Sequence, residues 1–86
     1  MLHVFEVYLT PVADPETLLS PDAKRDTGAQ IMTPAEAEAV GFAGLPKAPE
    51  GKVQRFVAVS ARDAQWIHRQ LESNPDVTSY RVHEVG

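Results

Sequence analysis

The stretch from Val53 to Val85 constrains the fold most, because its local signals agree on the order strand, helix, strand. Residues 53–59 are rich in β-branched and aromatic side chains and contain neither Gly nor Pro, which is typical of a strand. Residues 77–85 also lack Gly and Pro and predict a second strand. Two strands joined by a helix normally run parallel with a right-handed crossover, because only that hand packs the helix back onto a twisted sheet.

The segment between these strands predicts a helix over residues 61–73. Ser60 places a hydroxyl at the N-cap and Asp63 adds a carboxylate three residues later, so side-chain oxygens can accept from amides that lack an intrahelical partner. Pro75 ends the helix, because it disfavours helical backbone in the residue before it. One face of the helix carries the residues at spacings of three, four and seven, namely Ala64, Ile67, His68 and Leu71.

Residues 2–9 form a nearly continuous apolar run, which predicts a central strand because both of its faces are apolar. One face carries Phe5, Val7 and Leu9, and the other carries Leu2, Val4 and Tyr8. If this strand lies between the two C-terminal strands and antiparallel to both, the arrangement is a split β-α-β. We therefore predict an α+β fold, a small ferredoxin-like (split β-α-β) sandwich with three or four mostly antiparallel strands, one long helix and one short helix. The chain resembles ferredoxin-like modules in architecture only, so no functional residues are transferred from them.

Residues 10–33 predict a long loop, because prolines and aspartates interrupt them every few positions. Two cap-then-proline pairs allow short helical turns around residues 16–19 and 22–25. A connection of this length is uncommon in a small domain unless it has a function or is partly disordered.

A short helix is predicted over residues 34–40, where Thr33 and Glu36 have the spacing of a capping box. A fourth strand would have to lie near residues 28–32 or 42–45, and neither segment has a convincing strand signal. A sheet of three strands is the alternative.

Length and charge exclude several classes of protein. A chain of 86 residues has room for one domain, residues 1–86. Its net charge of −4 opposes binding to the anionic backbone of nucleic acid. The absence of cysteine excludes a disulfide, a thiolate zinc site and a cysteine nucleophile. No run approaches the roughly 20 apolar residues that span a bilayer, and the N-terminus does not look like a secretory signal. We expect a cytoplasmic protein that binds neither nucleic acid nor membranes.

The histidines are the main candidates for chemistry, because imidazole binds metals and transfers protons near neutral pH. His3 and His83 lie on strands that would be neighbours, and Glu6 and Glu84 are close to them in sequence. A small metal site is conceivable, but the spacing matches no ligand motif. We therefore predict no metal, no cofactor and no assigned catalytic residue. The alternative interpretation places His3 and His83 at an edge or open face of the sheet, and His68 in a partly buried position with a hydrogen-bonded ring.

Trp66 is the only tryptophan, and the helical wheel places it on the polar face, away from the apolar residues. Arg62 precedes it by four residues and Arg69 follows it by three. An exposed Trp flanked by Arg is typical of an interface hot spot. Two structural interpretations remain open: the arginines stack on the indole, or one of the long loops covers it.

The second candidate interface is the sheet face that carries Leu2, Val4 and Tyr8. If that apolar face is exposed, it needs a cover, and a second copy of the chain in a two-fold dimer is the simplest one. The equally weighted alternative is that the N-terminal loop covers this face within the monomer.

Two functions follow from these candidates. The first is a non-catalytic protein-interaction or regulatory module that associates with itself or with another protein through Trp66, Arg62, Arg69, Leu2, Val4 and Tyr8. The alternative is a small dimeric ferredoxin-like enzyme with a pocket between sheet and helices, in which His3, His83 or Tyr8 supplies acid-base chemistry. The first is preferred because no catalytic constellation is recognisable in the sequence.

Overall fold

A four-stranded antiparallel sheet forms the centre of the computed structural model, which describes residues 2–41 and 51–85. The strand order is β2-β3-β1-β4, so β1 lies between β3 and β4 and is antiparallel to both. The short strand β2 adds to the outer side of β3. The strand bounds are β1 Leu2–Leu9, β2 Gln30–Met32, β3 Val53–Ser60 and β4 Val77–Val85.

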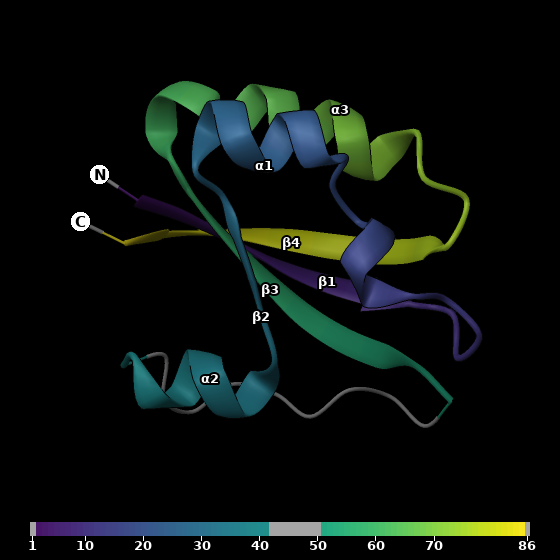
Figure 1. The fold of residues 1–86 in the computed structure, drawn as a ribbon. Helices are drawn as coiled ribbons and strands as arrows, with labels where there is room; N and C mark the ends of the chain where they lie inside the picture. Colours follow the sequence, from purple (N-terminus) through teal and green to yellow (C-terminus); the bar gives the residue numbers. More distant parts are fainter. Residues whose placement is uncertain (1, 42–50, 86) are drawn as a thin grey trace.

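Helices cover both faces of the sheet, with α1 and α3 on one face and α2 on the other (Figure 1). Their bounds are α1 Pro21–Thr27, α2 Pro34–Ala39 and α3 Ala64–Glu72. The described residues therefore hold three α-helices rather than one long and one short helix. The α+β class and the largely antiparallel sheet are confirmed.

Strand alternation decides which side chains reach which helix. Phe5, Val7 and Leu9 pack with Ile67 and Leu71 in the larger core, on the α3 face. The even-numbered residues of β1 face α2, where the smaller core consists of Val4, Met32, Ala37 and Phe56. In an antiparallel sheet, residues directly opposite each other point to the same face, so the register carries this division across all four strands.

The segment expected to be a long loop contains ordered structure: a 3-10 turn at Pro15–Thr17, then α1, then β2. The Ser20 hydroxyl accepts from the Ala23 amide, and Gly28 closes α1 with a φ of 67°, a left-handed conformation that glycine adopts without strain. Two adjacent leucines, Leu18 and Leu19, are buried in the larger core. Their apolar character, with that of Ile31 and Met32, predicts that parts of this segment dock on the body of the domain, and the burial of both leucines agrees with this.

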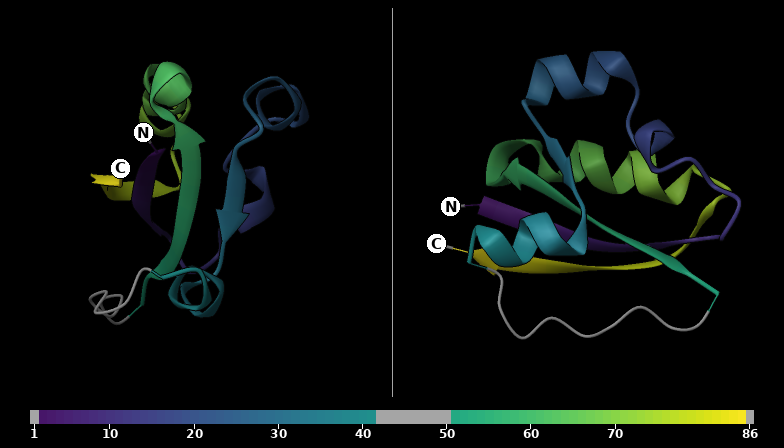
Figure 2. Two further views of the ribbon diagram at one scale, coloured as in Figure 1. Left: turned by 90° about the vertical axis from the view of Figure 1, so that its left-hand side faces the viewer. Right: turned by 60° about the horizontal axis from the view of Figure 1, so that its bottom comes forward.

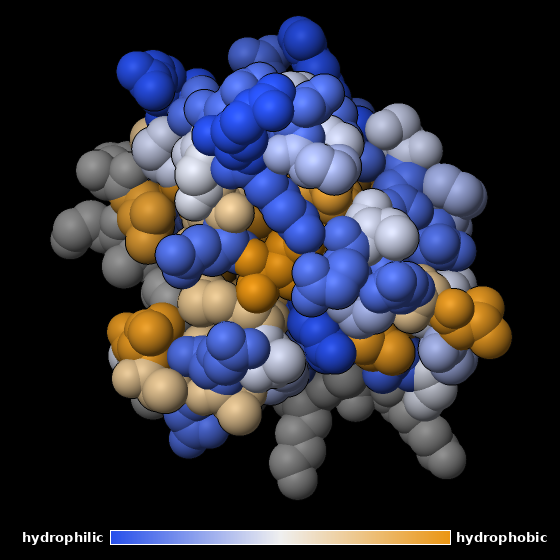
Figure 3. All heavy atoms as spheres, viewed as in Figure 1, coloured by the Kyte–Doolittle hydropathy of each residue, from blue (hydrophilic) through white to orange (hydrophobic). Residues whose placement is uncertain are grey.

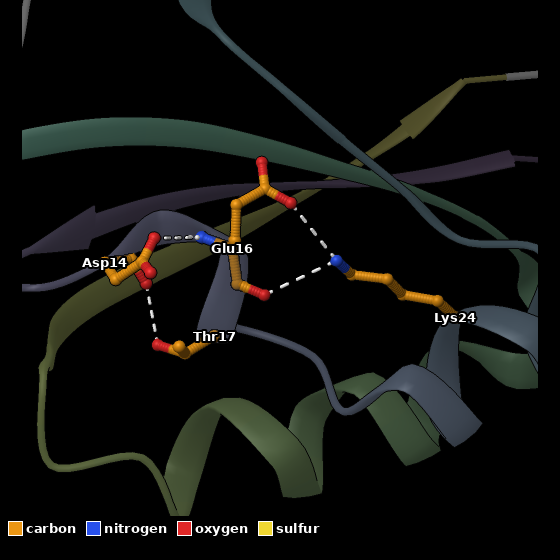
Figure 4. A network of polar contacts seen from close by, with 4 residues as sticks. All are labelled: Asp14, Glu16, Thr17 and Lys24. Atoms are coloured by element: carbon orange, nitrogen blue, oxygen red, sulfur yellow. Dashed lines mark hydrogen bonds and ion pairs between the residues drawn. The ribbon is translucent and has the colours of Figure 1, made fainter.

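A small polar network joins the 3-10 turn to α1 (Figure 4). Asp14 caps the turn by accepting from the Glu16 amide at 3.0 Å, and the Thr17 hydroxyl donates to the Asp14 carbonyl at 2.7 Å. Lys24 of α1 reaches back to the carbonyl and the carboxylate of Glu16 at 3.4 and 3.3 Å. These contacts are exposed, so we expect them to fix local geometry more than to stabilise the fold.

The fourth strand is β2, in the first of the two positions considered, and it pairs with β3 through Ile31 and its neighbours. Three residues are too few for a period-two pattern to stand out, which is why the sequence signal is weak. The second position considered, residues 42–45, lies outside the described residues.

The two predicted helix starts have different outcomes. Thr33 and Glu36 form the expected capping box at the start of α2. At the start of the C-terminal helix, the Ser60 hydroxyl instead donates to the Asp63 carboxylate at 3.0 Å and makes no cap to the backbone. The first turn, Ala61–Asp63, is a 3-10 turn, so α3 begins at Ala64 rather than at Ala61.

Candidate functional site

The most unusual side chain in the described structure is Glu6, a carboxylate in the middle of the central strand with 0% of its surface exposed. Strand alternation turns it to the α2 face, between Val4 and Tyr8. A buried carboxylate is costly unless hydrogen bonds replace the water it has lost. The neighbouring strands provide these bonds.

Side chains from β1, β3 and β4 connect to this carboxylate through hydrogen bonds, two of them directly and one through Tyr8. The Tyr8 hydroxyl donates to Oε2 of Glu6, and the His83 ring places Nε2 3.0 Å from Oε1. The Gln54 side-chain amide donates to the Tyr8 oxygen at 3.3 Å, which leaves the tyrosine proton for Glu6. We call Glu6, Tyr8, Gln54 and His83 the Glu6 cluster.

His83 connects the Glu6 cluster to solvent. A carboxylate can only accept, so Nε2 of His83 carries the proton in the bond to Glu6. Within residues 2–41 and 51–85, Nδ1 has no hydrogen-bond partner, and 44% of the His83 side-chain surface is exposed. The arrangement thus fixes one ring nitrogen in the interior and leaves the other as an available acceptor.

Tyr8 is held in its protonated form. Burial raises the pKa of Tyr8 above its usual 10.0, and the hydrogen bond to Glu6 and the charge of Glu6 raise it further. The Gln54 amide and the Arg81 charge act in the opposite direction. At neutral pH Tyr8 is therefore a hydrogen-bond donor to the carboxylate.

The register separates the two histidines that could have shared a metal. His3 pairs with Glu84 and Val4 pairs with His83, so the two imidazoles point to opposite faces of the sheet. His3 lies 3.9 Å from the Glu84 carboxylate, while His83 binds Glu6. Among the residues that the structure describes, no group of three His, Asp or Glu side chains could hold a metal ion.

The third histidine, His68, belongs to a separate series of hydrogen bonds on the sheet face that α3 covers. The Tyr80 hydroxyl donates to Glu72 at 3.0 Å, so Nδ1 of His68, 3.1 Å away, donates to the Tyr80 oxygen. The His68 ring also meets Phe5 edge-on, with ring centroids 4.9 Å apart. Burial raises the pKa of Tyr80, as does its bond to Glu72. His68 thus has the partly buried, hydrogen-bonded position expected of it.

Trp66 is half-buried and packs against the larger core, which includes residues of α1 and α3. Arg62 is exposed and lies 3.8 Å from the Asp63 carboxylate, and Arg69 is also exposed. Neither arginine stacks on an aromatic ring in the described part of the chain. The indole is therefore partly covered, and the interface role of Trp66, Arg62 and Arg69 stays a prediction.

The predicted apolar surface of Leu2, Val4 and Tyr8 also needs correction. Val4 is buried beside α2, and Tyr8 is buried in the Glu6 cluster. Leu2 alone of the three is exposed, at 37%. Figure 3 shows a different side of the molecule, with β2 in front, where apolar residues gather near the middle and lower left and polar residues surround them.

Residue type nominates His83 and Tyr8 for acid-base chemistry, and it places Glu6 beside the histidines only as a conceivable metal ligand, while Gln54 is not singled out. The available signal was a charged residue within an apolar strand, at the same alternation as Val4 and Tyr8. What the pattern did not supply was the register, which brings His83 and Gln54 onto the face of Glu6.

Comparisons with known proteins assign no family to this arrangement. The sequence matches no protein-family model and has no significant similarity to a curated protein. In residues 2–41 and 51–85, every helix is too short or too polar to cross a bilayer.

Proposed function

We propose that this protein is a small acid-base enzyme in which His83, held by the buried carboxylate of Glu6, exchanges a proton with the substrate. The single observation that supports it is the 3.0 Å contact between a fully buried carboxylate and a half-exposed imidazole. The ferredoxin-like description is part of the proposal, and the position of β1 between β3 and β4 supports it.

The proposed step uses the free ring nitrogen. Nδ1 of neutral His83 accepts a proton from the substrate, the bonding electrons stay on the substrate, and the imidazolium that forms is stabilised by the Glu6 carboxylate. Tyr8 and Gln54 hold Glu6 in place, so they act as positioning residues. Imidazole suits this role because its unperturbed pKa lies near neutrality.

The geometry favours this function over that of a non-catalytic interaction module. Val4 and Tyr8, proposed as contact residues, are buried, and Trp66 is half-buried. Two of the three acid-base candidates, His83 and Tyr8, meet on one carboxylate.

A generic carbon acid tests the proposal without knowledge of the natural substrate. In 5-nitrobenzisoxazole, removal of the proton on carbon breaks the nitrogen–oxygen bond and releases a coloured phenolate. We expect the wild-type protein to accelerate this reaction over buffer at the same pH. His83→Gln should lower the protein-catalysed rate about 100-fold, and Glu6→Gln should lower it by about tenfold or more.

His3→Gln is the matched control, because His3 lies on the opposite face and, among the residues that the structure describes, its only polar contact is the 3.9 Å one with Glu84. It should retain the wild-type rate. Circular dichroism should show that all variants are folded. The proposal fails if folded His83→Gln and wild-type protein have the same rate, or if His3→Gln loses as much rate as His83→Gln.

A self-associating interaction module is the second candidate, and the open edge of the sheet favours it. The nine-residue strand β4 pairs only with β1 among the described strands (Figure 2). A long unpaired edge offers backbone donors and acceptors to another strand. We propose a second copy of the chain as its partner, in a cytoplasmic homodimer. Light scattering coupled to chromatography tests this, and a strict monomer at high concentration would contradict it.

A further inference from the structure

We infer that the substrate of the Glu6 cluster carries a carboxylate group, and that Arg81 binds it. This inference rests on the proposed acid-base function and adds the chemical class of the substrate. It comes from the strand register, the partners of Glu6 and the lack of an ion pair at Arg81.

The register places Arg81 beside the Glu6 cluster. Arg81 of β4 lies directly opposite Glu6 of β1, so the two side chains share a face. Directly opposite residues in an antiparallel pair have Cβ atoms about 5 Å apart. The positive charge of Arg81 also opposes the rise in the pKa of Tyr8, as expected of a guanidinium on this face of the sheet.

Glu6 nevertheless does not neutralise Arg81. Its two oxygens are bound by Tyr8 and His83. In the described part of the chain, the exposed Arg81 makes neither an ion pair nor a hydrogen bond. A guanidinium without a partner, next to an oriented imidazole, is suited to a carboxylate, which it can bind through two parallel hydrogen bonds.

The spacing of the two residues limits the size of the substrate. Arg81 and His83 are two positions apart on one strand, which separates their Cα atoms by about 7 Å. Both side chains point to the α2 face and both residues are exposed. A small carboxylic acid whose exchangeable proton lies a few bonds from its carboxylate can reach both groups. Ser79, exposed on the same face, lies two positions before Arg81 on β4.

Binding of 3-hydroxybutyrate provides the test, with the uncharged 3-hydroxybutyramide as the matched probe. In nitrogen-15 NMR titrations, the acid should shift the amide signals of β4 around Arg81 and His83 in a saturable way. The uncharged 3-hydroxybutyramide should not cause these shifts. Arg81→Gln should weaken binding of the acid by about tenfold or more, because a charge-assisted hydrogen bond is lost. Arg69→Gln, an exposed arginine on α3, should bind like wild type.

The possible failures are distinguishable. If wild-type protein accelerates the nitrobenzisoxazole reaction but binds acid and amide equally, the carboxylate assignment is wrong and the acid-base function stands. Tighter binding of inorganic phosphate than of 3-hydroxybutyrate would also overturn the assignment. If the wild-type protein does not accelerate the reaction, the proposed function itself fails, whatever the acid does.

Discussion

Glu6 is the residue on which the rest of the candidate site depends. A carboxylate with no exposed surface loses its hydration, and the loss must be offset by donors inside the protein. Tyr8 and His83 are those donors, one on each oxygen. Because each donor satisfies a buried acceptor, the removal of either leaves a group that water cannot easily reach.

Tyr8→Phe tests this dependence. The variant keeps the ring but removes the donor to Glu6, so we expect the free energy of unfolding at pH 7 to fall by about 1–3 kcal/mol. Tyr80→Phe is the comparison, because its two partners, the exposed Glu72 and the partly buried His68, can bind water in place of the Tyr80 hydroxyl. Urea denaturation of both variants provides the comparison. Equal losses for the two variants would contradict the role assigned to Glu6.

The sequence predicts part of this site. Residue type alone nominates His83 and Tyr8, since imidazole and phenol are acid-base groups. It does not predict their convergence on Glu6, because a one-residue change of register would turn His83 to the other face. Gln54 has no distinguishing sequence signal at all.

Among the helices, the starts of α2 and of the C-terminal helix show how far residue spacing can predict an N-cap. The capping box of α2 forms as expected, with reciprocal bonds between Thr33 and Glu36. The similar pattern at Ser60 and Asp63 forms only a side-chain contact, and a 3-10 turn precedes α3. The residue spacing is the same and both N-cap residues are extended, but the turn that follows is α-helical after Thr33 and 3-10 after Ser60.

Alanine variants distinguish the two helix starts. Thr33→Ala should lower the free energy of unfolding by about 1 kcal/mol, because a backbone amide loses its cap. Ser60→Ala should lower it by only a few tenths of a kcal/mol, since an exposed side-chain contact contributes little. Thermal or urea unfolding measures both. A larger loss for Ser60→Ala would show that the cap at α3 is wrongly described.

The ease with which a strand is predicted from the sequence depends on the length of that strand. The three long strands have enough residues for their character to be recognised in the sequence, whereas the three residues of β2 do not. In residues 10–33 the cap-then-proline pairs predict short helical turns and the leucines predict docking, but the prolines and aspartates do not show how far α1 extends. The extent of such a segment depends on tertiary burial as well as on its local sequence.

For the whole molecule, the two tyrosines link stability to alkaline pH. The pKa values of Tyr8 and Tyr80 are raised in the folded protein above the usual 10.0. A raised pKa means that the folded state favours the protonated phenol more than the unfolded state does. The resulting stabilisation is complete below about pH 10 and is lost as the pH rises through the folded pKa values.

Urea unfolding at pH 9 and at pH 11 should therefore give a lower free energy of unfolding at the higher pH. The double variant Tyr8→Phe, Tyr80→Phe should show a smaller decrease over the same interval. An absorbance titration at 295 nm should place both phenols above the value for free tyrosine. If the double variant loses as much stability as the wild type, other groups cause the effect.

The hydrogen bond between Glu6 and His83 is the central claim, and NMR of the histidine ring protons tests it most directly. We predict a downfield signal from the Nε2 proton of His83, slow to exchange with water, which shifts upfield in Glu6→Gln because an amide oxygen is a weaker acceptor than a carboxylate. His3, which lies 3.9 Å from the Glu84 carboxylate, should show no such signal. A His83 ring proton that exchanges freely with water in both wild type and Glu6→Gln would contradict the claim.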